Sequence, residues 1–294
     1  MCDEFTAAAE QAALDRLAAE RGHFSRRQFA AMGAAAAMAA CASPSDGKTA
    51  ALRETTVRMT TADGIADAFF VHPAKGKHPG VIIWPDIGGL REVYYVMGRR
   101  LAGAGYAVLV VNQYYRSAVA PVLNSFAEWR TPAGQARIGP MIAAITPDGI
   151  ARDGSAFAAF LDTQRVVDRG RGIGTQGYCM GGPFAIRTAA AAPGRVRAAA
   201  SFHGAGLVGT AADSPHQLLA KTQASFLIAI GQNDDSGAPG DKDVLRAAAA
   251  AANRPAEIEV YPANHGWCVA DTPIYDAAQA ERAWERLLLL YKTL

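Results

Sequence analysis

Short apolar segments alternate with segments of helical periodicity along most of this chain, and this alternation limits its fold more than any other feature. Residues 79–84 and 106–111 are continuous apolar runs. A strand without a polar side is expected to be buried on both faces. The alternation therefore predicts an α/β domain with a mostly parallel central sheet and helices on both faces. In such sheets a ligand binds at the carboxyl ends of the strands.

The remaining elements follow from the same patterns. An Asp63-Gly64 turn predicts an N-terminal hairpin with strands at residues 55–59 and 66–71. Residues 112–148 contain four prolines and show no sustained period, which predicts a lid or a substrate wall, with a surface loop as the alternative. Further strands are expected at 171–176, 196–201, 225–230 and 257–261, and helices at 92–104, 149–165, 183–192, 241–252 and 275–292.

The composition narrows the class of protein. The 294 residues suffice for one large domain or two small ones. The 29 Lys and Arg residues nearly balance the 27 Asp and Glu residues, and no basic cluster occurs, so nucleic acid is not expected as a partner. Four cysteines without a CxxC pair indicate neither a disulfide scaffold nor a zinc site. A soluble α/β enzyme or binding protein remains.

The first fifty residues have the pattern of an export leader. Arg26 and Arg27 form a twin-arginine motif, and residues 30–40 are a short, alanine-rich apolar stretch. The Pro-, Ser- and Gly-containing tract that follows separates this segment from the rest of the chain. We therefore expect a leader and linker at 1–50, a single domain at 51–294, and export to a bacterial envelope. An alanine-rich surface helix is the alternative.

Two outcomes are open for the end of this leader. Residues 38–41 are similar to a lipoprotein cleavage box, which predicts a lipid anchor on Cys41. A cut near Ala40 would instead release a free periplasmic protein. No stretch of the chain approaches the roughly 20 strongly apolar residues of a membrane-spanning helix.

The strongest chemical signal is the sequence Gly177-Tyr178-Cys179-Met180-Gly181. It lies between a predicted strand and a predicted helix, as in the sharp turn that presents a nucleophile in α/β enzymes. That turn strains the backbone of its central residue, so the residues two positions away must lack side chains. A helix N-terminus favours the thiolate form of Cys179, and the Met180 amide points to where an oxyanion would form. This glycine frame predicts a nucleophile rather than a small buried apolar side chain.

Such a nucleophile requires an acid and then a histidine, in that order along the chain. His265 lies on a loop after the last predicted strand and is the expected base, whereas His203 also ends a strand and could line the pocket. Two carboxylates compete for the acid. A G-x-x-D pattern selects Asp234, and a D-x-x-x-P pattern selects Asp235, of which we prefer the first.

Together these motifs resemble the dienelactone hydrolases (carboxymethylenebutenolidases), which are α/β-hydrolases with a Cys–Asp–His triad. The likeness covers roughly residues 54–294 and includes the elbow, the turn at 231–235, the His265-Gly266-Trp267 sequence and the last helix. It implies hydrolysis of a small-molecule ester or lactone through a thioester on Cys179, with no metal or organic cofactor. The alternative class is a binding protein that retains this fold without catalysis.

The resemblance also assigns roles beside the triad. It implies that Asp86, where the family usually has glutamate, interacts with the resting thiol, and that the Ile87 amide is the second oxyanion donor. A helix-capping acid is the alternative for Asp86. Tyr115 and Arg116 match the family segment whose arginine grips the carboxylate of the substrate.

The substrate pocket is expected to differ from that of the family. The family's second arginine, four residues after the histidine, is replaced by Val269, so we do not expect a dienelactone substrate. Tyr178, Trp267 and the proline-rich insertion are predicted to line the pocket instead. Cys268 is expected to be a packed core residue, with an inhibitory disulfide to Cys179 as the alternative.

Overall fold

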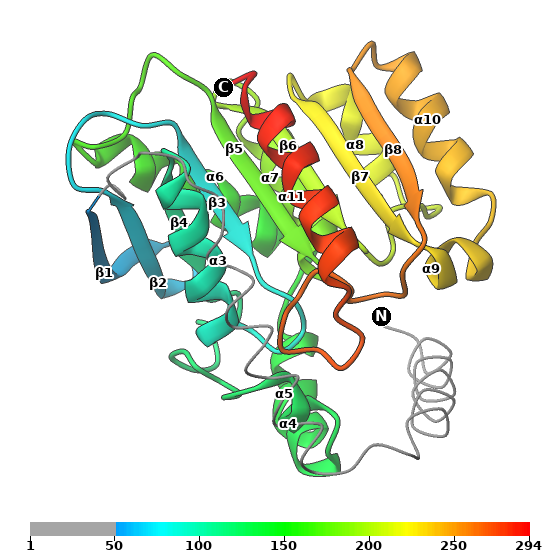
Figure 1. Ribbon diagram of the computed structural model, residues 1–294, viewed down its shortest axis with the longest axis horizontal. Helices are drawn as coiled ribbons and strands as arrows, with labels where there is room; N and C mark the ends of the chain where they lie inside the picture. Colours follow the sequence, from blue (N-terminus) through cyan, green and yellow to red (C-terminus); the bar gives the residue numbers. More distant parts are fainter. Residues whose placement is uncertain (1–50) are drawn as a thin grey trace. The chain divides into compact units, whose positions relative to one another are not determined.

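The structure of the protein is a computed structural model, and residues 51–294 are described from it. The predicted leader, its twin-arginine motif and Cys41 lie outside the described residues, so the expectations for them stay predictions. Within the described residues, eight strands form one sheet in the order β1-β2-β4-β3-β5-β6-β7-β8 (Figure 1).

The sheet combines an antiparallel edge with a parallel remainder. β1 pairs antiparallel with β2 through the predicted turn, and β2 pairs antiparallel with β4. All other neighbouring strands pair in parallel, as their buried sequences predict. The strands are β1 (Leu52–Thr61), β2 (Gly64–Pro73), β3 (Gly80–Trp84), β4 (Ala107–Val111), β5 (Ile173–Tyr178), β6 (Val196–Phe202), β7 (Ser225–Gly231) and β8 (Ala256–Tyr261).

Helices cover both faces of the sheet, and alternate residues of each strand belong to different faces. In β3, Ile82 and Trp84 pack in one apolar cluster with α6 (Pro147–Thr163), α7 (Gly181–Ala191) and α10 (Asp241–Ala251). Val81 and Ile83 pack in a second cluster, with α3 (Glu92–Gly103) and α11 (Ala277–Tyr291). Each fully buried large apolar side chain stabilises the fold by about 1.5–3 kcal/mol relative to an exposed one.

The insertion at 112–148 contains two helices that its sequence did not predict, α4 (Phe126–Trp129) and α5 (Pro132–Ala143). Pro132 occupies the first turn of α5, where a missing N–H costs nothing, and the Thr131 hydroxyl accepts a hydrogen bond from the Gly134 amide at 3.0 Å. Figure 1 shows both helices beyond the carboxyl ends of the parallel strands.

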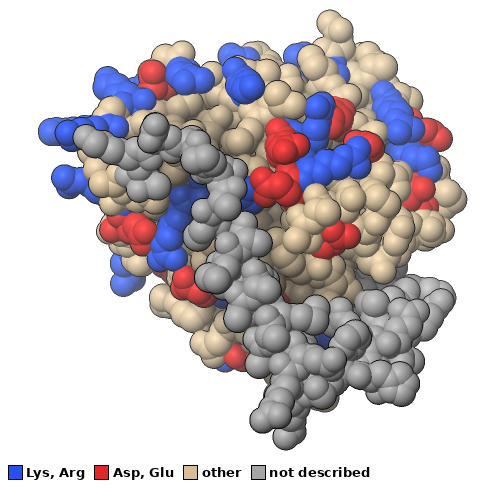
Figure 2. Space-filling view, in the orientation of Figure 1, with Lys and Arg blue, Asp and Glu red and all other residues tan. Residues whose placement is uncertain are grey.

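Three further short helices were also not predicted, and they lie in connections between strands: α8 (Pro215–Leu218), the 3₁₀ turn η1 (Leu219–Lys221) and α9 (Gln232–Gly237). None of the helices within residues 51–294 combines the length and apolarity needed to cross a bilayer. On the face drawn in Figure 2, outside the grey atoms, basic and acidic side chains are interspersed.

Candidate active site

The predicted elbow is formed where β5 turns into α7. Cys179 has a φ of 53°, in the left-handed region that side chains other than glycine rarely occupy. A Cβ atom at Gly177 would lie 1.8 Å from the carbonyl oxygen of Gly181, and one at Gly181 would lie 2.4 Å from that of Trp84. Both glycines are therefore required by close backbone approaches, as the sequence pattern predicts.

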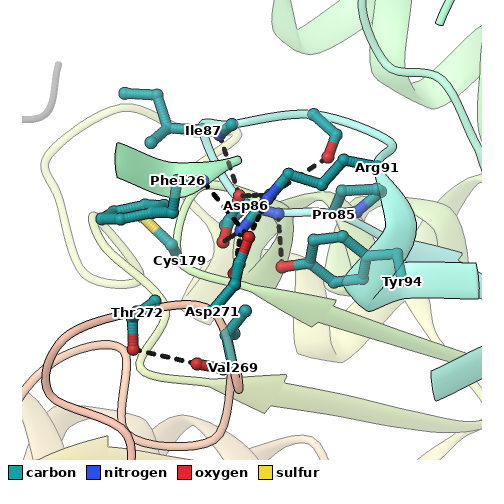
Figure 3. A network of polar contacts seen from close by, with 12 residues as sticks. Pro85, Asp86, Ile87, Arg91, Tyr94, Phe126, Cys179, Val269, Asp271 and Thr272 are labelled. Atoms are coloured by element: carbon teal, nitrogen blue, oxygen red, sulfur yellow. Dashed lines mark hydrogen bonds and ion pairs between the residues drawn. The ribbon is translucent and has the colours of Figure 1, made fainter. Parts of the chain in front are cut away.

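The backbone of Cys179 is fixed by the end of β6. Its amide N–H lies 3.1 Å from the Phe202 carbonyl oxygen and 3.1 Å from Nδ1 of His203, and it donates to both. The Cys179 side chain is buried in the same apolar cluster as Ile87, and Phe126 packs against that cluster. Figure 3 draws Cys179 together with the polar network of Asp86.

His265 is oriented by Asp234 rather than by Asp235. Its Nδ1 lies 3.0 and 3.1 Å from the two carboxylate oxygens of Asp234, which can only accept, so Nδ1 carries the proton. The His265 amide N–H donates to Asn233 Oδ1 at 2.7 Å, which fixes the loop. Asp235 instead accepts a hydrogen bond from Nζ of Lys242 at 2.6 Å. In the neutral ring with its proton on Nδ1, Nε2 is the nitrogen that can accept a further proton.

A second histidine lies next to this pair. His203 is buried, and its ring centroid lies 4.6 Å from that of His265 in an edge-on arrangement. Burial, with a smaller contribution from His265, lowers the pKa of His203 well below its usual value, so the ring is neutral. Because Nδ1 accepts the Cys179 amide, the proton of His203 is on Nε2, which has no hydrogen-bond partner among the described residues.

The loop after β3 is held from several sides. The Asp86 carbonyl accepts a hydrogen bond from Gln113 Nε2 at 2.6 Å, which fixes the peptide plane that carries the Ile87 N–H. The Ile87 carbonyl accepts from the Tyr114 hydroxyl at 2.8 Å, and the Asp86 N–H donates to the Tyr94 hydroxyl at 2.9 Å. A peptide held in this way can offer a preorganised donor to a developing oxyanion.

The Asp86 side chain is bound by an arginine that the sequence did not single out. Arg91 donates to both Asp86 carboxylate oxygens, at 2.6 and 3.0 Å, and to both oxygens of Asp271, at 2.7 and 2.8 Å (Figure 3). Burial alone would lower the pKa of Arg91, but the charge of Asp86 and the hydrogen bonds that Arg91 donates to both carboxylates raise it above its usual range. The guanidinium is therefore permanently charged inside the protein.

Similarity to known proteins identifies the family of this chain. Residues 66–294 match the family model described as "Dienelactone hydrolase family". The chain belongs to the dienelactone hydrolase family. It is a hydrolase of esters or lactones with the α/β-hydrolase fold, which confirms the predicted fold class.

Relatives and solved structures agree with this assignment. A "Putative carboxymethylenebutenolidase" of Methylorubrum extorquens is 27% identical over 237 residues, covering 79% of this chain and 78% of that protein. One of Escherichia coli K12 is 27% identical over 261 residues, covering 81% and 90%. The structure of a "Putative Dienelactone Hydrolase" from Klebsiella pneumoniae shares the fold with a TM-score of 0.72 and 24% identity, covering 83% of this chain and 100% of that one.

Two predicted pocket residues prove to be core residues of this dienelactone hydrolase family member. Tyr178 stacks on Phe202 with a centroid distance of 5.1 Å, and its hydroxyl accepts a hydrogen bond from Gln176 at 2.7 Å. Trp267 is fully buried and stacks on Tyr261 at 5.2 Å. The prediction that they line the pocket is wrong, because both rings point into the apolar cluster beneath the site.

Arg116 is already bound by carboxylates of the protein. Its Nη1 lies 2.7 Å from Asp153, and its Nη2 contacts Asp153 at 2.9 Å and also Asp63. The Tyr115 hydroxyl donates to Asp153 at 2.7 Å. Both residues of the family segment thus join the β1–β2 hairpin to α6, and this geometry does not leave Arg116 free to grip a substrate.

The remaining thiol is packed as expected. Cys268 and Cys179 are both buried, and neither of them forms a disulfide within residues 51–294. Burial raises the pKa of the Cys268 thiol well above its usual value, so it stays protonated. Within residues 51–294, no group of three His, Cys, Asp or Glu side chains converges in a way that could hold a metal ion.

Proposed function

We propose that the protein cleaves a carboxylic ester or lactone by covalent catalysis, with Cys179 as nucleophile, His265 as base and Asp234 as the orienting acid. The observation that carries this proposal is the pairing of Asp234 with Nδ1 of His265 beside a cysteine held at a φ of 53°. An acid, a histidine and a nucleophile in these roles form the same constellation on unrelated folds.

The reaction proceeds in two halves. The Cys179 sulfur, deprotonated with the help of Nε2 of His265, attacks the substrate carbonyl carbon and forms a C–S bond. Collapse of the tetrahedral intermediate breaks the C–O bond, and His265 returns the proton to the leaving alcohol. Water, deprotonated by His265, then attacks the thioester, and the acid product leaves as the thiol is regenerated.

Charge on the intermediate is stabilised by backbone amides. Met180 is the N-cap residue of α7, so its N–H lies at the helix N-terminus, where negative charge is favoured. The Ile87 N–H is held in place by Gln113 on the neighbouring carbonyl. In this proposal Asp86 and Arg91 position the Ile87 peptide, since Arg91 already binds both oxygens of the Asp86 carboxylate.

The test compares matched variants on an activated short-chain ester. Cys179→Ala is expected to abolish hydrolysis while leaving the unfolding transition in place. Asp234→Asn is expected to lower kcat by about 10²–10⁴-fold, because the base loses its orientation, whereas Asp235→Asn, which alters only the Lys242 pair, should change it little. Turnover that survives in Cys179→Ala would reject the mechanism.

A binding protein without catalysis is the alternative function, and thiol labelling separates the two. An activated Cys179 should react with a thiol reagent quickly and with a pH dependence that Asp234→Asn shifts. Slow labelling, together with no hydrolysis of any ester or lactone in a panel, would favour the binding protein.

We also propose that residues 1–50 direct export through the twin-arginine route, with a lipid on Cys41 as anchor. The support is the sequence alone, since these residues lie outside the described part of the chain. Replacing Arg26 and Arg27 by lysine should retain the protein in the cytoplasm, and Cys41→Ala should release it from the membrane fraction. Periplasmic protein after the double replacement would refute the route.

A further inference from the structure

The guanidinium group of Arg91 has no donor left for a substrate. Nε donates to Asp271, Nη1 donates to Asp86 and to the Gly89 carbonyl, and Nη2 donates to both carboxylates. These bonds use all five N–H groups that an arginine possesses. The Arg91 side chain is only 1% exposed, so it is not accessible to solvent either.

The ion cluster lies where three parts of the site meet. Asp86 precedes the Ile87 peptide, and Asp271 belongs to the loop that carries His265. Asp271 also accepts a hydrogen bond from the Phe126 amide at the start of α4, at 3.2 Å. Figure 3 shows Cys179 and Phe126 beside this cluster. Its charge therefore acts on whatever approaches the nucleophile.

The cluster carries excess negative charge. One positive side chain, Arg91, faces two carboxylates, and Asp234, which is paired with His265, adds a third carboxylate. The neighbouring ion pairs are balanced and supply no compensating positive charge: Arg116 and Arg152 with Asp63 and Asp153, and Lys242 with Asp235. Because the Asp271 side chain is 27% exposed, its charge is the one least shielded by protein.

We propose that the site takes esters or lactones with an uncharged acyl group, and that Asp271 is a specificity-determining residue that disfavours anionic acyl groups. This inference rests on the proposed function. It follows because Arg91 and Arg116 are both bound by carboxylates of the chain itself. A negative charge close to the reacting groups lowers the local concentration of an anionic substrate.

The test uses two esters that differ by one charge, mono-para-nitrophenyl adipate and its neutral methyl ester. The wild type is expected to hydrolyse the neutral ester with the higher kcat/KM. Asp271→Asn should reduce that preference about sixfold. This is the effect expected when a repulsion between the Asp271 carboxylate and a substrate carboxylate about 8 Å away is removed, at an effective dielectric constant of about 40.

Asp162→Asn is the matched control. Asp162 is 29% exposed and also pairs with an arginine, Arg195, but it lies near the end of α6, which leads to the amino end of β5. Its removal should leave the ratio of the two kcat/KM values unchanged.

The insertion also carries Arg130, which is exposed at the end of α4. A site that used this cation to bind the acyl group would prefer the anionic ester.

A second measurement needs no variant. Salt screens charge, so raising the ionic strength should increase the wild-type rate on the anionic ester relative to the neutral one. Equal or preferred turnover of the anionic ester, or an unchanged ratio in folded Asp271→Asn, would overturn the inference. If neither ester were cleaved in a Cys179-dependent way, the proposed function itself would fail instead.

Discussion

The φ of 53° at Cys179 predicts that the elbow stores strain, and substitution at this one position can measure it. An L-residue in this region costs about 1–2 kcal/mol, whereas glycine adopts it freely but loses about 0.5–1 kcal/mol more chain entropy on folding. Cys179→Gly should therefore be about 1 kcal/mol more stable than Cys179→Ala. For a domain of this size that corresponds to about 2–4 °C in Tm. Both variants lack the thiol and should be inactive.

The assay is urea unfolding of the two variants side by side. Asn253 provides the matched control. It is exposed after α10, has a φ of 52° like that of Cys179, and has no part in the site, so Asn253→Gly is compared with Asn253→Ala. We expect the same difference of about 1 kcal/mol there. If the Asn253 pair shows it and the Cys179 pair does not, the elbow is not strained and the reasoning is refuted.

Two further predictions concern the supports of the elbow. Gly177→Ala places a Cβ 1.8 Å from the backbone oxygen of Gly181 and should destabilise the fold by at least about 3 kcal/mol. The control Gly103→Ala, which has open space around the new Cβ, should instead stabilise the fold by up to about 1 kcal/mol. Equal urea midpoints of the two variants would contradict this prediction. His203 is held neutral, so its contribution to stability is lost as pH falls below its unfolded pKa of about 6.5, by at most about 1.4 kcal/mol per pH unit. His203 has a φ of 40°, which asparagine tolerates, so His203→Asn should flatten this acid-side slope in unfolding titrations, and an unchanged slope would contradict the prediction.

The parallel core could be predicted from the sequence because burial on both faces leaves a pattern that no other element imitates. β3 and β4, predicted at 79–84 and 106–111, begin only one residue later than expected. The helices of the insertion could not be predicted in this way. Residues 112–148 show no sustained period, although Pro132, at the first turn of α5, favours a helix start.

The acid of the site could be narrowed to two residues but not to one. Asp234 and Asp235 are neighbours in the short helix α9, so their side chains leave the helix in different directions. Only the position of the His265 loop determines which of them meets the imidazole, and that position depends on Asn233. The two sequence patterns therefore select different residues, and the hydrogen-bond geometry agrees with the preferred one, Asp234, whose carboxylate meets Nδ1 of His265.

The Arg91 cluster had no signal in the sequence. Arg91 and Asp271 are 180 residues apart, and each is surrounded by an ordinary loop sequence. Likewise, an aromatic residue beside a nucleophile can point into the pocket or into the core. Tyr178 and Trp267 point into the core because the fold places Phe202 and Tyr261 where their rings can stack. Side-chain direction at a turn depends on contacts that local sequence does not contain.

The strand order has a consequence for the chain while it is being synthesised. β3 ends at Trp84 and pairs with β4 on one side, but its other neighbour, β5, begins only at Ile173, about ninety residues later. At a translation rate of about 5–20 residues per second, the backbone N–H and C=O groups along one edge of β3 stay unpaired for about 5–18 seconds until β5 has been synthesised. An unpaired edge of this kind recruits strands from other chains. Nascent chains that stall between these two strands should therefore depend on a chaperone, whereas chains that have passed β5 should not.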